Sequence, residues 1–539
     1  GNDATNTLQV DEVAGSAANV GVQQTLASGA TVTIDVNGAI AYDPNGAFEG
    51  LQTGQTATDT VTYRVKDPAG ATSNTATVTI TINGVNDAPQ AVARRFNAVR
   101  QTALEVEPGA TAISAPRVRV AGSLLTGATD VDDPAANADL VDETISTPHG
   151  TVDLDPDGSF VYTSAAGDSA TTDTFSFKIK DTHNAQSTQT VTIDLQGGVY
   201  YVDNDNNGAA DGTSTKPFKT VQLATAAAGT GDTIHVGASA GTTTSAATLK
   251  NNQVIVGAGK ALTANLTGGG ENTGATTLVA AGTAPTLGTT SGAVLTLASG
   301  NTVDSVDIDP DTTAKGIVAA SAGAVTLKDV TVVDAGTAST GAAIDLTGAN
   351  ASASLQNVDI TTQSATGLKL TNSAISADTA STIAATGGPA VDSSGATGGT
   401  LSFGTVSSTN SSGTGISLGG AAAFSATGGS LTGSAGIGFD LNGGAASVSY
   451  PGAISPAPGA GVVRVQNRTG ATATPLRQPD VHRQLASDHR LRQHGRHDGV
   501  QRLDQGADQR DRQCRQPDEQ HRGDRAVPGR RPRRLVVER

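Results

Sequence analysis

Several residue types are rare or missing in this chain of 539 residues. It has no methionine or tryptophan, and its single cysteine, Cys514, excludes an intramolecular disulfide. Aromatic residues make up 3% of the sequence, which excludes a core built mainly from large rings. No apolar run approaches the roughly 20 residues that a membrane-spanning helix needs. Because position 1 is not methionine, we expect a fragment or a processed piece of a longer product.

The charge is strongly negative and unevenly distributed. The formal net charge is −16; residues 475–539 contain sixteen Arg, eight Asp and two Glu, or +6, so residues 1–474 carry −22. Such an acidic segment repels nucleic acid and is compatible with divalent cations. Large, acidic, almost cysteine-free repeat proteins are common among exported bacterial proteins. We therefore expect an extracellular or cell-surface location on a bacterium, and no nucleic-acid partner.

Glycine is abundant, with 66 residues. Between the turns, apolar and polar residues alternate with the period of a β-strand. Residues 31–48 alternate on both sides of Asn37-Gly38, a strong hairpin signal. Residues 59–67 and 76–84 alternate in the same way. The sequence therefore predicts an all-β chain whose first unit, residues 1–89, is an antiparallel β-sandwich.

The first unit closes with Val85-Asn86-Asp87-Ala88-Pro89. With the strand text DTVTYRVKDPAG and TATVTITINGVNDAP, this ending resembles a VCBS or bacterial cadherin-like repeat. The resemblance implies a Ca²⁺-binding linker between neighbouring modules, to which Asn86 and Asp87 would contribute. The alternative is that these residues only end a strand and turn the chain.

Residues 90–198 repeat the pattern. The segments 150–163, 173–181 and 188–195 occupy the same places as the strands of the first unit, at a spacing of roughly 110–120 residues. A second cadherin-like β-sandwich is therefore predicted. The acidic cluster Asp130, Asp132 and Asp133 is interpreted as a solvated loop at a sandwich end.

The sequence pattern changes at residue 199. Asp211-Gly212-Thr213 opens a turn, residues 221–228 (VQLATAAA) can form a short helix, and Gly231-Asp232-Thr233 leads into an apolar alternation. This order resembles the entry of pectin-lyase-like right-handed β-helices, in which a short helix caps the first rung. The resemblance implies a fold and little about function, because that fold serves lyases, hydrolases, adhesins and inert stalks.

Residues 199–474 then show a repeat of small aliphatic positions. Successive apolar positions from Leu295 are separated by 22, 27, 24, 23, 25 and 23 residues and end at Phe439. A period in this range indicates stacked rungs, none of which buries its apolar face alone. We predict a right-handed parallel β-helix over residues 199–474.

The loop at the start of this region places oxygen-bearing side chains at alternating positions. Asp203, Asp205, Asn207 and Asp211 surround Gly208, but position twelve is Ser214 where an EF-hand has glutamate. The loop is therefore either a shorter type of Ca²⁺ loop or a polar linker. With Asn86 and Asp87, these four residues complete the predicted metal ligands, Ca²⁺ being the expected cofactor, and this loop is expected to bind it better.

A catalytic constellation is lacking. A β-helix lyase needs a basic side chain beside a group of acids, yet no arginine occurs between Val120 and Val463. The acids Asp304, Asp307, Asp309 and Asp311 fit the outward face of a strand and its turn. We expect a non-catalytic, adhesin-like surface protein with sandwich spacers and a β-helix stalk, and a cell-surface or matrix ligand such as polysaccharide. The alternative is a polysaccharide-active, lyase-like β-helix enzyme with accessory sandwiches.

The last 65 residues, 475–539, differ from everything before them. They contain no threonine, isoleucine, phenylalanine, tyrosine or lysine, and five of the eight histidines. A basic tail and a His/Cys metal site are two interpretations. The third, which we favour, is an out-of-frame translation. If suitable synonymous codons are chosen for this segment, shifting the reading frame by one base gives a sequence like that of the solenoid repeats. Such a tail is expected to be disordered.

Overall fold

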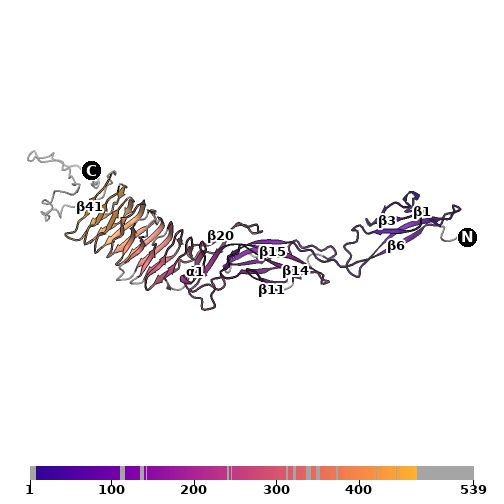
Figure 1. Ribbon diagram of the computed structural model, residues 1–539, viewed down its shortest axis with the longest axis horizontal. Helices are drawn as coiled ribbons and strands as arrows, with labels where there is room; N and C mark the ends of the chain where they lie inside the picture. The colour runs from indigo at the N-terminus through magenta and orange to yellow at the C-terminus, as the bar shows by residue number, and fades with distance from the viewer. Residues whose placement is uncertain are drawn as a thin grey trace, which may run out of the picture.

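A computed structural model describes residues 8–469 apart from 110–115, 134–138, 141–142, 239–241, 245, 311–313, 320–322, 335–340, 348–351, 372–373, 421 and 445. The tail at 475–539 lies outside the described residues. The molecule is elongated and all-β: module 1 (residues 8–89), module 2 (residues 90–198) and a β-solenoid follow one another (Figure 1). The predicted fold class is confirmed. No helix in the described ranges is long and apolar enough to cross a membrane.

Module 1 is built from two three-stranded antiparallel sheets. One contains β1 (Gln9–Val13), β5 (Thr56–Lys66) and β6 (Ala76–Asn83), and the other β2 (Gln24–Thr25), β3 (Thr31–Ile34) and β4 (Ile40–Asp43). The predicted hairpin at Asn37-Gly38 joins β3 to β4, and Gly38 adopts a positive φ of 87°. The core is small and is formed by Val10, Val13, Val32, Ile34 and Val61.

Module 2 has more strands and a larger core. Its strands are β7 (Arg94–Arg100), β8 (Ala103–Glu107), β9 (Arg117–Ala121), β10 (Asp139–Leu140), β11 (Glu143–Thr147), β12 (Gly150–Leu154), β13 (Phe160–Ser164), β14 (Thr172–Lys180) and β15 (Gln186–Val202). One sheet has the order β10-β14-β15-β7 and the other β11-β12-β13-β8-β9. Phe160 makes edge-on contacts at 5.4 Å with both Phe96 and Phe175, a favourable geometry for buried rings.

Strand β15 continues from module 2 into the solenoid without interruption. Its first part pairs with β14 and β7, and its last residues, Val199–Val202, pair in parallel with β16 (Thr233–Val236). The boundary expected between residues 198 and 199 therefore lies inside a strand. Helix α1 (Val221–Ala227), predicted at 221–228, begins at the N-cap Thr220, whose hydroxyl accepts a hydrogen bond from the Leu223 amide.

The solenoid is a stack of about nine turns around one apolar core. A nine-stranded parallel sheet contains β18 (Ala247–Thr248), β23 (Ala293–Thr296), β26 (Lys315–Val318), β28 (Ala342–Leu346), β30 (Thr366–Thr371), β33 (Val391–Gly395), β35 (Ile416–Gly419), β38 (Phe439–Asn442) and β41 (Val463–Gln466). Leu295 is aligned with Ile317, Ile317 with Ile344, and so on to Phe439. The 22–27-residue spacing found in the sequence is therefore the spacing between aligned residues on neighbouring strands of this sheet.

The remaining solenoid strands extend the sheet that begins in module 2. They are β17 (Thr243–Thr244), β19 (Val254–Gly257), β22 (Thr286–Thr289), β24 (Thr302–Asp304), β25 (Asp307–Pro310), β27 (Val325–Asp334), β29 (Ser352–Thr362), β31 (Ala374–Ala377), β32 (Thr382–Thr386), β34 (Gly398–Thr409), β36 (Ala423–Gly428), β37 (Ser430–Thr432), β39 (Val448–Ser449) and β40 (Ala453–Ser455). Bends within this sheet are made at positive φ by Ser305, Asp329 and Asn357.

One turn carries an insertion that the sequence pattern did not reveal. Ala247 and Leu295 are adjacent in the nine-stranded sheet although they are 48 residues apart. The extra residues form a hairpin of β20 (Leu262–Leu266) and β21 (Gly274–Val279), here called the arm. The arm buries Leu262, Leu266 and Leu278 in the core of module 2. Glu271 at its tip forms a two-pronged ion pair with Arg94 of β7, at 2.6 Å for each bond.

The arm and β15 couple module 2 to the solenoid, so Leu278→Ala tests that coupling. Leu278 is fully buried, and its truncation leaves a cavity worth about 2–5 kcal/mol of unfolding free energy. We expect unfolding followed by urea titration to lose that amount and to separate into two transitions. The matched control is Leu223→Ala on helix α1, whose side chain is 49% exposed. Equal effects of the two changes would contradict the assigned role of the arm.

His235 is buried, although it alternates with Ile234 and Val236 along β16 and so lies on the opposite face of the strand from these two core residues. The first two turns of the solenoid are covered on this side by module 2 and the arm, which leaves His235 only 4% exposed beside the ring of Tyr201. Its Nε2 makes no hydrogen bond with the described residues. Burial in this apolar setting lowers the pKa of His235 to about 4, because the charged imidazolium is poorly solvated there.

A lowered histidine pKa makes stability depend on pH in a known direction. The unfolded chain takes up a proton near the ordinary pKa of 6.5, whereas the folded chain does so only near 4. The contribution of His235 is therefore fully present above 6.5 and is lost as pH falls through that window, by about 3 kcal/mol. We expect His235→Phe to lose less stability than the wild type between neutral pH and pH 4 in urea unfolding. Parallel curves for the two proteins would contradict this.

Candidate functional site at the junction of the two modules

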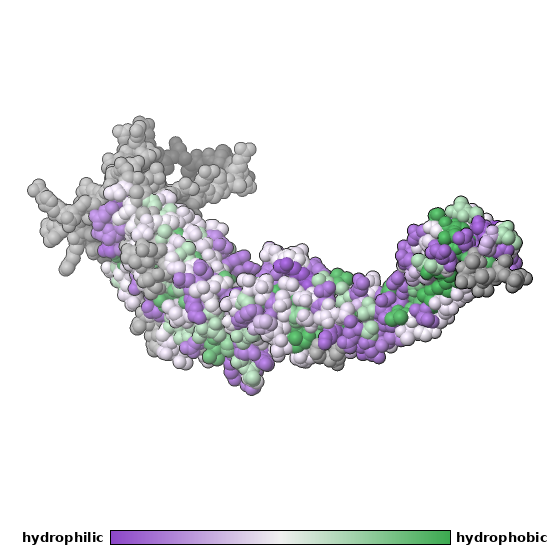
Figure 2. Space-filling model, turned by 45° about the vertical axis from the view of Figure 1, so that its right-hand side comes forward, coloured by the Kyte–Doolittle hydropathy of each residue, from purple (hydrophilic) through white to green (hydrophobic). Residues whose placement is uncertain are grey.

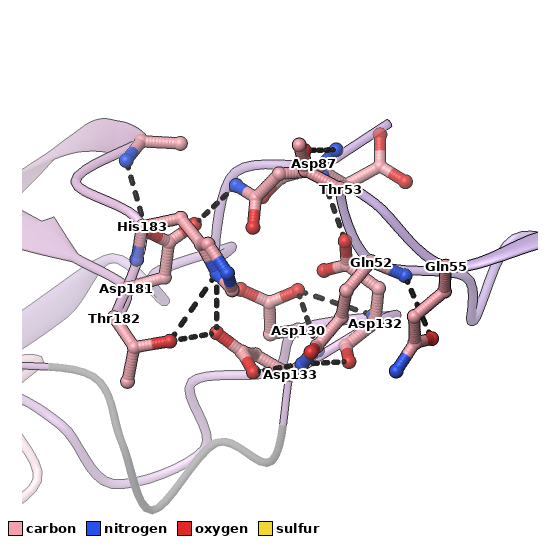
Figure 3. Close-up of polar contacts among 12 residues, drawn as sticks. Gln52, Thr53, Gln55, Asp87, Asp130, Asp132, Asp133, Asp181, Thr182 and His183 are labelled. Atoms are coloured by element: carbon pink, nitrogen blue, oxygen red, sulfur yellow. Dashed lines mark hydrogen bonds and ion pairs between the residues drawn. The ribbon is translucent and has the colours of Figure 1, made fainter. Parts of the chain in front are cut away.

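Four segments meet where module 1 ends and module 2 begins (Figure 3). They are the linker 85–89 after β6, the loop 129–133 before β10, the turn 181–185 between β14 and β15, and residues 49–55 before β5. All four are connections at the ends of sandwich strands, where polar side chains lie free of the core. A recess of about 520 Å³ between the modules is lined by Glu49, Asp87 and Asp130 among others.

The linker residues predicted as ligands lie in this junction. The Asn86 amide nitrogen donates to Asp181 Oδ2 and to the Asp87 carbonyl, each at 2.7 Å, and its backbone N–H donates to Thr53 Oγ1. The Asp87 backbone N–H donates to Asp132 Oδ2 at 3.1 Å. The linker is therefore held by side chains from both modules.

The acidic loop is part of the same site, so its interpretation as a solvated loop was wrong. Asp133 is only 5% exposed and accepts hydrogen bonds from Gln52 Nε2 and, at 2.6 Å, from Thr182 Oγ1. His183 Nδ1 lies 3.5 Å from the same carboxylate. Gln52 also donates to the Asp132 carbonyl at 2.9 Å, so a module 1 side chain holds the loop of module 2.

The carboxylates of the junction are in unequal electrostatic surroundings. Burial, with a further contribution from the neighbouring Asp132 carboxyl, raises the pKa of Asp130 above its usual value. Burial acts in the same direction on Asp181, but hydrogen bonds from Asn86 and from the amides of Ala185 and His183 outweigh it, so the pKa of Asp181 is lowered. The ionised form of Asp130 is therefore disfavoured in the folded protein, whereas that of Asp181 is favoured.

Three buried oxygens at the junction have no hydrogen-bond partner among the described residues: Asn86 Oδ1, Asp130 Oδ2 and Asp132 Oδ1. Unpartnered buried polar atoms are costly, and carboxylate and amide oxygens are the ligands that Ca²⁺ prefers. The donor set thus fits a hard cation. Within the described ranges, however, no three His, Cys, Asp or Glu side chains converge into a group that could hold a metal ion.

The second predicted loop uses its oxygens locally. Asp203 Oδ1 accepts from the Asp205 amide, and Asp211 Oδ1 accepts from both donors of Thr213. Asn207 Oδ1 accepts from Lys219, 3.2 Å away. These contacts are those of ordinary polar turns, and they do not bring the four residues to one point. Calcium binding here stays a prediction.

Three ion pairs lie on the described solenoid turns. Lys260 lies 2.5 Å from Asp304, Lys315 lies 2.7 Å from Asp345, and Arg464 lies 2.5 Å from Asp440. Asp304 is therefore buried against a lysine, and Asp311 lies outside the described residues. The expectation that the chain is non-catalytic stays a prediction.

The similarity to known proteins follows the division between sandwiches and solenoid. The family model described as bacterial cadherin-like domain matches residues 1–84 and again residues 86–197. The two modules are cadherin-like. The matched segments leave the solenoid uncovered, and no curated protein matches the chain.

Solved structures similar to the chain include cadherin ectodomains. A protocadherin gamma B4 extracellular domain matches with 18% identity and a TM-score of 0.18, over 31% of this chain and 25% of that one. The human desmocollin-1 ectodomain matches with 14% identity and a TM-score of 0.16, over 33% and 34% of the two chains. The chain thus spans well under half of these structures, and neither match carries a functional argument.

The cadherin-like modules share a contact that sequence reasoning missed. In module 1, the Tyr42 hydroxyl donates to Asp59 Oδ2 at 2.7 Å, and in module 2 the Tyr162 hydroxyl donates to Asp173 Oδ2 at 3.0 Å. Burial and the adjacent carboxylate raise the pKa of Tyr42 to about 12. Both tyrosines lie four residues after a hairpin glycine, Gly38 or Gly158, but the aspartates follow their tyrosines by 17 and 11 residues, so only the fold shows that they meet.

The raised pKa of Asp130 predicts the effect of removing its charge. A folded-state pKa above the unfolded value means that stability is present below about pH 4 and is lost as pH rises through the folded-state pKa. In calcium-free buffer we expect Asp130→Asn to raise the melting temperature at pH 7 and not at about pH 3. The amide oxygen can still accept from the Asp132 and Asp133 amides. A lower melting temperature at pH 7 would contradict the electrostatic account.

Proposed function

We propose that the chain is a non-catalytic part of a bacterial surface repeat protein. The cadherin-like modules act as spacers, and the solenoid acts as a stiff stalk or adhesive surface. The proposal is supported by the combination of cadherin-like modules with a stacked solenoid. The expected ligand is a cell-surface or matrix molecule, with polysaccharide as a candidate.

Calcium stiffens the junction between the modules in this proposal. The observation that carries it is the set of three unpartnered oxygens, on Asn86, Asp130 and Asp132, beside the carboxylates of Asp87 and Asp181. A divalent cation would remove the repulsion between these acids and would tie the linker to the loop 129–133. Because the linker and the loop belong to different sides of the joint, binding would restrict the angle between the modules.

Calorimetric titration with Ca²⁺ tests the proposal. We expect binding with Kd about 10⁻⁴–10⁻³ M, as is usual for extracellular modules, and a gain of about 1.4 kcal/mol at tenfold Kd. Asp130→Asn/Asp132→Asn should abolish the heat. The matched control, Asp203→Asn/Asp205→Asn, removes two carboxylates from the other predicted loop and should leave the junction heat unchanged.

Each alternative has its own outcome in this experiment. Loss of heat only in the Asp203/Asp205 variant would place calcium in the loop 203–211 instead. No heat and no change in melting temperature at millimolar Ca²⁺ would leave both as plain polar turns. For the solenoid, sustained release of unsaturated products from acidic polysaccharides with Ca²⁺ would replace the structural role with a lyase role.

A further inference from the structure

Tension along the molecule would enter module 2 at one strand and leave it at another. The linker 85–89 leads into β7, and β15 is the strand that continues into the solenoid. In Figure 1 the three parts lie in a row, with β15 between the solenoid and the linker. Figure 2 shows module 2 and the solenoid as one continuous body, with a narrower segment leading to module 1. A pull on module 1 against the solenoid therefore acts on the start of β7 and on the end of β15.

Strands β7 and β15 are paired in a way that resists such a pull. They are parallel neighbours, with seven aligned pairs from Arg94 and Val191 to Arg100 and Gly198. Because the pull acts on opposite ends of two parallel strands, it slides one strand along the other. The hydrogen bonds connect the two strands along their whole length, so sliding loads these bonds together and not one after another. Strands β8 to β14 lie outside this path.

The tip of the arm holds the other edge of β7. The Glu271 amide donates to the Arg95 carbonyl at 2.8 Å, and the Glu271 carboxylate forms the two-pronged ion pair with Arg94. Asn272 takes the place of a strand residue. Its Oδ1 accepts from the Asn97 amide at 2.7 Å, its Nδ2 donates to the Asn97 carbonyl at 3.0 Å, and its own carbonyl accepts from Asn97 Nδ2. Strand β7 is thus bonded along both edges, to β15 and to the arm.

The glycine run 268–270 allows the tip to approach β7 and β15 closely. A Cβ on Gly270 would lie 2.6 Å from the Asn97 backbone nitrogen, which is too close for any side chain. The Gly269 amide donates to the Asp194 carboxylate of β15 at 2.9 Å. The tip therefore contacts both strands of the parallel pair at the same place.

We propose that the arm is a mechanical clasp, which fastens β7 to the solenoid and raises the tension that the joint between module 2 and the solenoid withstands. This role rests on the proposed function, because a stalk that holds a ligand at a cell surface is pulled along its length. The arm leaves the solenoid between β19 and β22, so the force that reaches β7 divides between two connections. One runs through β15 into the first turn, and the other runs through the arm into a later turn.

The contacts of the tip differ from those of the arm's buried leucines, which already account for packing. The Glu271 side chain is 41% exposed. Exposed ion pairs contribute little to stability at equilibrium. Under tension, however, the bonds of the tip must break before β7 can slide. Loss of these bonds is therefore expected to matter more under force than in the absence of force.

Single-molecule force measurements on the full chain in calcium-free buffer test the clasp. Handles are attached through Val85→Cys in the linker and Val333→Cys on the solenoid, at two exposed positions, and Cys514→Ser removes the natural thiol. Failure of module 2 is recognised by its gain in length. The extended length of residues 94–198 is about 350 Å, from which the folded width of the module is subtracted.

Variants of the tip give the expected result. At constant force, Glu271→Ala/Asn272→Ala should raise the rate of failure of module 2 about tenfold. Glu271→Gln, which removes only the charge, should raise it less and serves as the second variant. The matched control is Thr273→Ala, at the exposed neighbouring position of the tip, and it should leave the rate unchanged.

A second pulling geometry separates a clasp from a merely structural contact. Moving the first handle to Ala166→Cys, at an exposed position between β13 and β14, takes the load away from the start of β7. In this geometry the double variant should fail at the same rate as the protein with an unchanged tip. A zero-force unfolding rate in urea should likewise change much less than the rate under tension.

Two results would overturn the clasp. Equal acceleration in both geometries would show that the tip stabilises the fold without bearing tension along β7. A rate unchanged by the double variant, with the handles at positions 85 and 333, would show that the tip bears no tension at all. Either result leaves the proposed function standing, because calcium titration and the polysaccharide assay test that function separately.

Discussion

The pairing of strand edges is the constraint on which the whole molecule depends. A single rung of the solenoid buries too little apolar surface to be stable, so each rung depends on the hydrogen bonds and side-chain ladders of its neighbours. The first rung would have an open edge, but β15 supplies its neighbour, and β15 is itself the last strand of module 2. Module 2 thus acts as the structured beginning of the stack, and the arm extends the contact.

The two joints of the molecule are built from different interactions. Between module 2 and the solenoid, strand β15 is continuous and the leucines of the arm are buried in the core of module 2. Backbone hydrogen bonds and apolar packing therefore fix the solenoid relative to module 2. Between module 1 and module 2, the described contacts are mainly hydrogen bonds of the linker and of Gln52 to acidic side chains. Such contacts have little buried apolar area behind them, so the first joint is the one whose stiffness a bound ion could control.

The acidic junction keeps negative charges close together at a cost in stability that the proposed cation would remove. The junction holds more carboxylate oxygens than hydrogen-bond donors. One oxygen of Asp130 and one of Asp132 therefore have no donor among the described residues. An arrangement of this type is less stable than a neutral one in the absence of a cation, and this agrees with the proposed binding of calcium. The solenoid shows the opposite solution, in which buried acids such as Asp304 and Asp345 each face a lysine.

The sequence alone determined the class of fold and the register of the stack. Alternation with period two and the 22–27-residue spacing are local consequences of burying one face of each strand, so Leu295 to Phe439 could be aligned in advance. The arm was missed because its apolar positions look like those of any rung, and only their burial in the core of module 2 distinguishes them. The acids posed the same difficulty. Whether Asp133 is solvated or buried depends on Gln52 and Thr182, which lie far away in the sequence. Only the tertiary structure decided which polar side chains meet, because no local period records a contact between loops.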